Sequence, residues 1–403
     1  MTIQQICIAL GAAATLGAAQ AHTHTVAAPT TPATWPGGKA PALLTDPRAA
    51  SRAGMPEREA LLQAAETALE RGMVSTAVLG FEQAATMLHA ADSEMGLVRA
   101  WMQAGEYRRA LAFCAHAAGA HLDSPSASAL YAWLLRIGGQ DTVASRVLAQ
   151  TAERAPRDPV VAAVRRAFDS ASPTASSELL ATPHRMAPQG TQRGAGQMPP
   201  DDAQLVSSGV LLGVGDVALV PSASVANGLR FWVRDGLGRT TEAHVDTTPD
   251  AIQAVGLTAL RLLSRLGPVN ISSAPKDPFA GSPGFAIAYA ASAAATPAWP
   301  WLSQGFFGGF DGAAGLRKLG ITLPAALAGG PVFDSHGQLA GIALQGAATQ
   351  TSMLPASMFS AFAKDSAGAM SPAAEPDNPV ARMAPSEAYE RALTIALQVI
   401  VLR

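Results

Sequence analysis

The chain has 403 residues, 49% of them hydrophobic and 14% charged, with a formal net charge of −2. That length favours two domains with linkers, each able to bury a sizeable core. A charge so close to neutral, without a long basic run, gives no electrostatic basis for a nucleic-acid partner. The histidines show no metal-ligand spacing of the helical or finger type, so we expect no metal site and no cofactor.

Residues 1–21 have the composition of a secretory signal peptide. An apolar segment from Ile6 to Ala19 ends in Ala19-Gln20-Ala21, the small-residue pattern of a cleavage site. The segment before it carries only the α-amino charge, which a misassigned start would explain. After cleavage Cys114 is the one remaining cysteine, so no intramolecular disulfide can form. We expect a periplasmic or secreted bacterial protein with no membrane span in the mature chain.

Residues 22–50 are rich in Pro, Thr, Ala and Gly, which predicts a flexible linker. From residue 51 to residue 169 the pattern becomes helical and repetitive. A glycine recurs every 33 or 34 residues, with an alanine five positions later and a bulkier apolar residue nine positions later. The three columns are Gly72, Gly105 and Gly139; Ala77, Ala110 and Ala144; and Phe81, Cys114 and Leu148. Glycine permits a tight turn between paired helices, and alanine lets helices approach closely.

This period, together with the segment Gly105–Leu111, resembles the tetratricopeptide repeat. The resemblance implies three helix pairs, at about 57–90, 91–124 and 125–158, and a capping helix from Pro159. It also implies a concave face, built from the first helix of each pair, that binds a protein or peptide partner. The residues expected on that face are Glu66, Met95, Arg99, Met102, Trp133 and Arg136. Arg and Trp often anchor interfaces and Met adapts to varied partners, although packing within the array is the alternative for each.

Residues 170–203 are rich in Ser, Pro, Gly and Gln and predict an interdomain linker. From residue 204 to residue 365 short β-prone runs alternate with turn residues, which predicts an all-β barrel or sandwich. The stretch 326–344 is the most informative. There the turn Gly329-Gly330-Pro331 leads into Val332-Phe333, and a polar turn ending in Gly337 separates it from a second apolar run. Two β-prone runs around such a turn predict a hairpin.

This stretch resembles the nucleophile loop and following hairpin of trypsin-like serine peptidases, especially the HtrA/Deg branch, whose loop reads Gly-Asn-Ser-Gly-Gly-Pro. Three further segments match landmarks of that family in the same order: Ser208–Leu212, Trp232–Gly236 and Met353–Ser357. The resemblance covers roughly residues 205–362 and implies a two-barrel β domain. The expected fold class is therefore a multidomain α plus β chain, with an N-terminal helical repeat array and a C-terminal trypsin-like domain.

The same resemblance locates three replaced catalytic positions. Ala328 stands where the family has its serine nucleophile and Ser224 where it has the histidine base. Gln253 or a neighbour stands where it has the orienting aspartate, with Asp250 a few residues upstream. A methyl group cannot attack a carbonyl, and the other two residues do no triad chemistry without a nucleophile. The backbone at Gly329 and Gly330 could still bind a ligand. The resemblance thus implies an inactive serine protease-like domain, a pseudoprotease.

Residues 366–403 form a tail in which Glu387–Arg403 is expected to be a helix, with a strand at its β-branched end as the alternative. The sequence favours an exported non-catalytic scaffold that binds protein or peptide partners through the helical groove and the former peptidase cleft. One alternative is a divergent trypsin-like serine endopeptidase with an unrecognised nucleophile. Another is a β domain with a purely structural role, with binding confined to the helices. The pattern favours no particular oligomeric state.

Overall fold

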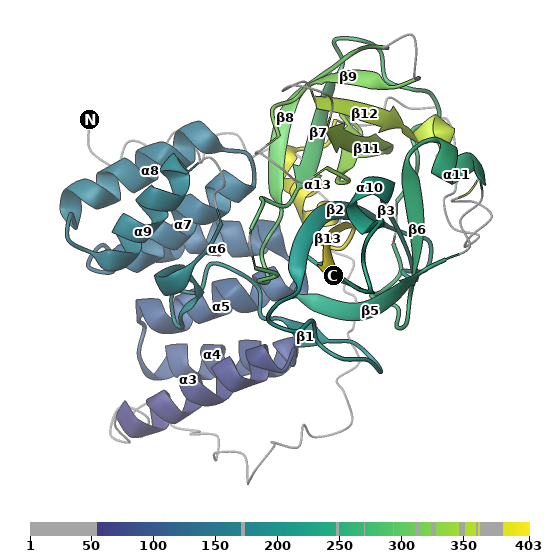
Figure 1. The fold of residues 1–403 in the computed structure, drawn as a ribbon. Coiled ribbons are helices and arrows are strands. Elements are labelled where there is room, and N and C mark those ends of the chain that lie inside the picture. The colour runs from purple at the N-terminus through teal and green to yellow at the C-terminus, as the bar shows by residue number, and fades with distance from the viewer. Residues whose placement is uncertain are drawn as a thin grey trace, which may run out of the picture. The chain divides into compact units, whose positions relative to one another are not determined.

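The computed structural model describes residues 55–170, 174–246, 250–269, 271–292, 294–310, 315–323, 328–345, 351–359, 362 and 382–403 (Figure 1). All of them belong to one compact unit, Leu44–Arg403. The expected signal peptide (1–21), the first linker (22–50) and most of the tail before residue 382 lie outside the described residues. Among the described helices, none combines the length and the apolar character needed to cross a bilayer.

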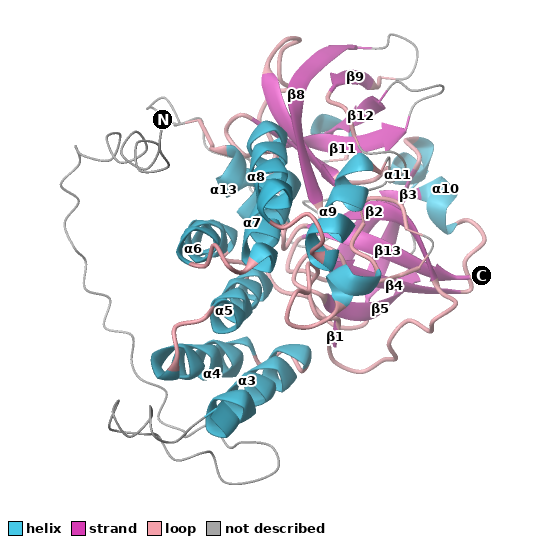
Figure 2. Cartoon of the chain, turned by 90° about the vertical axis from the view of Figure 1, so that its left-hand side faces the viewer, coloured by secondary structure: helices cyan, strands magenta, loops and turns pink. Residues whose placement is uncertain are grey.

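The described part of the helical array contains seven helices (Figure 2). The helices α3 and α4, α5 and α6, and α7 and α8 form three successive hairpins, and a further helix, α9, packs on the last pair. Their bounds are α3 (Met55–Glu70), α4 (Val74–Met87), α5 (Ala91–Ala104), α6 (Tyr107–Ala120), α7 (Pro125–Ile137), α8 (Asp141–Arg154) and α9 (Pro159–Asp169). A short 3-10 helix, η1 (Ser177–Leu180), follows.

The repeating residues do what their chemistry predicts. Gly72, Gly105 and Gly139 occupy the turns inside the three hairpins, with φ angles of 73°, 85° and 78°, a region that glycine enters without steric strain. The alanine and bulky columns are buried in the array: Ala77, Phe81, Ala110, Cys114, Ala144 and Leu148. The periodic sequence therefore encodes both the turn and the close packing of each hairpin.

The first barrel contains six antiparallel strands in the order β5-β4-β13-β2-β3-β6, and pairing of β6 with β5 closes it. The strands are β2 (Gln204–Leu212), β3 (Val217–Pro221), β4 (Arg230–Asp235), β5 (Arg239–Val245), β6 (Leu257–Leu262) and β13 (Ala396–Leu402). Two short helices, α10 (Ser222–Val225) and α11 (Asp250–Ala254), lie in the connections. A two-residue strand, β1 (Thr191–Gln192), adds in parallel to β5.

The strand β13 is a correction to the sequence-based expectation. The helix expected over Glu387–Arg403 is only α13 (Pro385–Ala392), and the alternative, a strand at the β-branched end, is correct. Six of the seven residues of β13 are buried, and the strand pairs with β2 on one side and β4 on the other. The run Val399-Ile400-Val401 prefers such a two-sided ladder, because β-branched side chains pack well on a pleated surface.

The second barrel is closed by six antiparallel strands in the order β10-β11-β12-β9-β8-β7. Its strands are β7 (Pro283–Ala288), β8 (Trp301–Phe310), β9 (Arg317–Gly320), β10 (Pro331–Asp334), β11 (Leu339–Gln345) and β12 (Thr351–Pro355), and a 3-10 turn, η2 (Ala356–Met358), follows. The predicted hairpin is confirmed: β10 pairs with β11 around a turn in which Gly337 has a φ of 72°. The predicted fold class, a helical repeat array followed by a two-barrel β domain, is also confirmed.

The three glycine turns of the array lie next to residues of the segments that follow it. A Cβ built at Gly72 would lie 3.0 Å from Thr191 Cγ2, one at Gly105 would lie 3.5 Å from Leu237 Cδ2, and one at Gly139 would lie 2.7 Å from Leu302 Cδ2. Glycine therefore serves two purposes at these sites. It permits the turn between the helices, and it leaves room for a neighbouring segment of the chain.

The helix α13 makes a second connection between the two parts. The ring of Tyr389 packs against that of Tyr107 on α6, with 4.4 Å between the centroids, and its hydroxyl donates to the Pro300 carbonyl over 2.8 Å. Next to this pair, the guanidinium of Arg108 binds the Glu390 carboxylate, with Nη2 2.9 Å from Oε1. A short tail helix therefore joins the array to the chain segment that enters the second barrel.

Candidate functional site

Ala328, Gly329 and Gly330 form a turn held between the two barrels. The carbonyl of Ala328 accepts a hydrogen bond from the N–H of Ser208 on β2 (2.8 Å), and the N–H of Gly329 donates to the carbonyl of Ala343 on β11 (2.7 Å). Gly329 has a φ of 103°, and a Cβ there would lie 2.1 Å from the Ser208 carbonyl oxygen. A Cβ on Gly330 would lie 1.9 Å from a carbonyl oxygen of β7. The close approach of both barrels therefore requires glycine at both positions.

Ser224 lies on α10, which begins where β3 ends. The last residue of β3, Pro221, borders the turn, because a Cβ on Gly329 would lie 2.7 Å from its Cδ. Ser224 is half-buried. Ser224, the position that the family resemblance assigns to the base, is therefore three residues from Pro221, which contacts the Ala328 turn.

Gln253 lies on α11, and its side chain is exposed. The segment after α11 reaches α10, because the N–H of Ser222 donates to the carbonyl of Gly256 over 2.9 Å. The hydroxyl of Thr258 on β6 also donates to the Ser222 hydroxyl over 2.9 Å. The structure thus brings the elements that carry the three replaced positions to one end of β3.

The two histidines in residues 204–365 lie on other elements. His244 is an exposed residue of β5, and His336 is an exposed residue of the turn after β10. The strand β10 leads from the Ala328 turn to the His336 turn. Its length of three residue steps places the two turns about 10 Å apart. Neither imidazole occupies the position of a base beside Ala328.

The buried ionisable groups of the first barrel support its strands. Burial raises the pKa of Asp235, although the Arg239 cation opposes the shift, and Asp235 Oδ1 accepts the N–H groups of Leu237 and Arg239 at 3.0 Å. Burial lowers the pKa of Arg234 to about 10, and its Nη1 donates to the Ala295 carbonyl over 2.6 Å. These contacts close a turn and fix a loop, so the groups are structural in this arrangement.

The array residues expected to bind a partner are mostly covered by the chain itself. Arg99 forms a bidentate ion pair with Glu66, with Nη1 2.9 Å from Oε2, and both side chains are buried. Beside them, the Gln103 amide oxygen accepts the backbone N–H of Gln189 over 3.0 Å, so the predicted interdomain linker runs across this face. The buried side chains of the set are Glu66, Met95, Arg99, Met102 and Trp133.

Trp133 and the remaining residue, Arg136, also contact other parts of the chain. Trp133 makes an edge contact with Trp301 of β8, with 5.7 Å between ring centroids. Arg136, which is half-buried, stacks over Phe168 at 4.5 Å and pairs with Asp141 at 3.0 Å. These side chains contact segments of the same chain, which agrees with the alternative of packing within the protein; partner binding by this face stays a prediction.

No protein-family model matches the chain, and no curated protein matches it. Among solved structures, the crystal structure of the MamO protease domain from Magnetospirillum magneticum (apo form) is similar to 41% of this chain and to 91% of its own. The sequence identity is 19% and the TM-score is 0.33. The site is therefore interpreted from this chain's own geometry.

The sequence patterns do not predict a second group of polar residues that the structure brings together. His89, Glu94 and His116 lie together on the helical array, with His121 beside them. No pair of them has the spacing of a familiar metal motif, and the signal that could have found them is the repeat geometry, which places consecutive helices side by side.

Proposed function

We propose that this chain is an exported, non-catalytic relative of trypsin-like peptidases that works as a binding or scaffold protein. The observation that carries the proposal is the Ala328 turn. Its Gly-Gly-Pro frame is packed between two closed barrels, yet it presents a methyl group where acyl transfer requires an oxygen nucleophile. Export remains an expectation from the sequence of residues 1–21.

The hydrogen bonds of the turn support this proposal. The N–H of Gly329 donates to the Ala343 carbonyl on β11, and the Ala328 carbonyl accepts the N–H of Ser208 on β2. These two bonds fix the turn to a strand of each barrel, as expected for a structural joint.

We place the partner surface on the β domain, because the array residues suited to binding are occupied by the chain. Three phenylalanines are exposed on the second barrel: Phe279 (84%), Phe306 (59%) and Phe310 (56%). Phe306 and Phe310 belong to β8, and the loop after Phe279 is bonded to that strand through the Gly281 N–H and the Phe307 carbonyl (2.7 Å). Exposed aromatic side chains are typical anchors for a protein or peptide partner.

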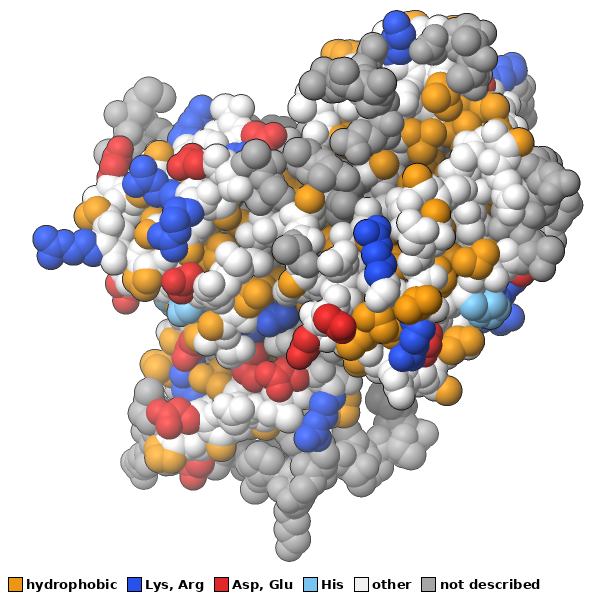
Figure 3. All heavy atoms as spheres, in the orientation of Figure 1, with side chains coloured by type: hydrophobic (Ala, Val, Ile, Leu, Met, Phe, Trp, Pro, Cys, Tyr) orange, Lys and Arg blue, Asp and Glu red, His pale blue; other side chains and the backbone are white. Residues whose placement is uncertain are grey.

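Figure 3 shows patches of hydrophobic side chains over the β domain on the face drawn, with a few charged side chains between them. Around the β8 phenylalanines, the Arg317 guanidinium lies 5.0 Å from the Phe310 ring centroid, which holds one face of the ring in place. A rigid aromatic ring loses little conformational entropy on binding. This supports Phe310 as part of the partner surface.

The first experiment treats the purified full chain with a serine-directed phosphonate probe and with an unfolded protein as substrate. The proposal expects neither labelling nor digestion. Stoichiometric labelling would overturn it in favour of a divergent serine endopeptidase, and the labelled residue would identify the nucleophile.

The binding half of the proposal is tested by pull-down from a bacterial envelope extract with the full chain as bait. Phe310→Ser should reduce recovery of a specific partner. Leu79→Ser is the matched control, because Leu79 is also 56% exposed but lies on α4 of the array. Equal recovery with both variants would remove the β domain as the partner surface.

A further inference from the structure

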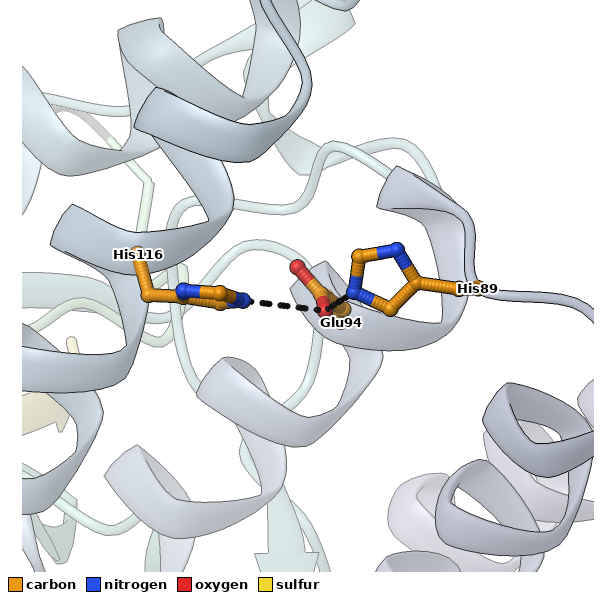
Figure 4. A group of neighbouring side chains, drawn as sticks. All are labelled: His89, Glu94 and His116. Atoms are coloured by element: carbon orange, nitrogen blue, oxygen red, sulfur yellow. Dashed lines mark ion pairs between the residues drawn. The ribbon is translucent and has the colours of Figure 1, made fainter.

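Three imidazoles surround one buried carboxylate on the helical array. Glu94, in the first turn of α5, is 3% exposed. His89 comes from the segment between α4 and α5, and His116 comes from α6; Figure 4 shows both rings directed at the Glu94 carboxylate from opposite sides. His121, at the end of α6, approaches the same carboxylate. Four residues of metal-ligating types thus converge from three consecutive elements.

The distances between these groups fit a single tetrahedral metal ion. His89 Nε2 lies 2.7 Å from Glu94 Oε1, His116 Nε2 lies 3.8 Å from Oε1, and His121 Nε2 lies 3.2 Å from Oε2. Zinc binds imidazole nitrogen and carboxylate oxygen at about 2.0–2.2 Å, so ligand atoms around one tetrahedral ion are separated by roughly 3.3 Å. The separations of His89 and His116 from Oε1 lie on either side of that value, and the ligand atoms of His89, Glu94 and His116 all lie within 4.8 Å of one another. His121 approaches the other carboxylate oxygen, Oε2.

The hydrogen bonding of the group also indicates a missing cation. Glu94 Oε2 and His121 Nε2 are both buried, and neither has a hydrogen-bond partner among the described residues. They are 3.2 Å apart, so two lone pairs face each other unless a proton or a metal ion lies between them. In the part of the chain that is described, the ion pairs of Glu94 are all with imidazoles. A buried carboxylate in such surroundings needs a positive charge.

We propose that His89, Glu94, His116 and His121 bind one zinc ion. Three neutral imidazoles and one carboxylate complete a tetrahedral set, which leaves no position for a reacting water and makes the site structural. The ion would clip the α4–α5 segment and α6 to α5, joining the first two helical hairpins. Cys114 is left out of the set, because its Sγ is directed at the Ala127 carbonyl, 4.0 Å away.

The site is accessible without unfolding. The side chains of His89 and His116 are 60% and 57% exposed, whereas those of Glu94 and His121 are 3% and 11% exposed. An ion can therefore enter from solvent between the two exposed imidazoles and meet two buried ligands. The exposed pair can also be replaced with little effect on the packing of the array.

The test uses the full chain, purified without a polyhistidine tag and treated with a chelator. Titration with Zn²⁺ by calorimetry is expected to show one ion per chain, and Co²⁺ should give the absorption of a tetrahedral centre. His89→Ala and His116→Ala should each weaken Zn²⁺ binding by about 100-fold or more, since even outer-shell changes reduce affinity 10- to 100-fold. His244→Ala, an exposed histidine of β5, should leave binding unchanged.

Three results would overturn the proposal. One is the absence of Zn²⁺ binding by the folded chelator-treated chain. Another is binding that persists in His89→Ala and His116→Ala but is lost when His22 and His24 are replaced. The third is a melting temperature that changes with pH through the imidazoles but does not rise with added Zn²⁺, which would make the group a proton-sharing cluster. His89 and His116 are exposed, so their alanine variants are expected to fold. They therefore test the site even if a variant of the buried carboxylate, such as Glu94→Gln, does not fold.

Discussion

Arg99 of α5 and Glu66 of α3 form a bidentate ion pair across 33 residues of sequence, and both side chains are buried. They stand at equivalent positions of consecutive helical hairpins. A buried charge is tolerated when its partner and hydrogen bonds remain, and it becomes strongly unfavourable when the partner is removed. The pair therefore links the first two hairpins through side chains of the protein itself.

We expect Arg99→Met to lower the free energy of unfolding by about 3–5 kcal/mol, because it leaves the Glu66 carboxylate buried without its partner. The double variant Glu66→Leu/Arg99→Met should recover most of that loss. Urea unfolding of the two single variants and the double variant gives the coupling energy. Strictly additive losses would show that the two side chains stabilise the array independently.

The glycine turns provide a comparison at matched backbone geometry. Gly105 and Gly139 have φ angles of 85° and 78°, so alanine at either site incurs the left-handed strain of about 1–2 kcal/mol. At Gly139 the new Cβ would also lie 2.7 Å from Leu302 Cδ2 and 3.0 Å from its carbonyl oxygen, whereas at Gly105 the nearest atom is at 3.5 Å. Gly139→Ala should therefore destabilise more in urea unfolding. Equal losses in the free energy of unfolding would mean that Leu302 moves aside without a measurable cost.

The last strand gives a prediction about the first barrel. Removing residues 396–403 should open that barrel, because β13 is hydrogen-bonded to both β2 and β4. Limited proteolysis should then cut within residues 204–262, while the helical array stays protected. Removal of the exposed Arg403 alone is the control and should leave the digestion pattern intact. Survival of an intact first barrel in the longer deletion would contradict the strand order.

Asp334 gives a prediction about pH. Burial raises the pKa of Asp334 above its ordinary value of 3.8, against the lowering effect of the N–H groups of Gln338 and His336. A raised folded-state pKa means that this group's contribution to stability is complete below pH 3.8 and is lost as pH rises through the folded pKa. Asp334→Asn keeps an acceptor for these N–H groups and removes the titration.

Relative to the unaltered chain, Asp334→Asn should therefore gain stability as pH increases across that acid window. Urea unfolding at closely spaced pH values measures the difference. A difference that stays constant with pH would mean that the carboxyl titrates alike in the folded and unfolded chains.

Restoring the nucleophile alone should not restore chemistry. Ala328→Ser places a hydroxyl in the turn, but the two histidines of the β domain lie on β5 and beyond β10, so no base among the described residues accepts its proton. We expect no phosphonate labelling of the folded variant, with circular dichroism as the folding control. Labelling of this variant, with none of the unaltered chain, would reveal a base supplied by another element.

The parts of the fold that sequence predicted are those whose signals are local. The glycine and alanine columns around Gly105 and Ala110 report turns and close packing directly, and the Gly337 hairpin carries its own turn residue. The placement of β13 depended on pairing with strands far away in sequence, which periodicity does not report. A strongly apolar run such as Val399–Val401 fits either a buried helix face or a strand.

The candidate site combines positions taken from the family resemblance, whose triad roles stay a prediction, with surroundings that only the structure shows. The resemblance located Ser224, Gln253 and Ala328, and the structure gathers their elements at one end of β3. Arg99 and Trp133 have the residue types of an interface, but those types serve an intramolecular interface equally well. The imidazoles around Glu94 come from three elements, so their convergence depends on helix packing and leaves no spacing motif in the sequence.

The position of β13 has a consequence for biosynthesis. The strand fits between β2 and β4, yet residue 396 is translated 161 residues after residue 235, the end of β4. At about 5–20 residues per second, a ribosome needs roughly 8–30 s to cover that distance. During this interval β2 and β4 each lack a neighbour, while the helical hairpins, built from local contacts, can fold as they emerge. The barrel whose strands are synthesised first is therefore completed last, after every strand of the second barrel has been made.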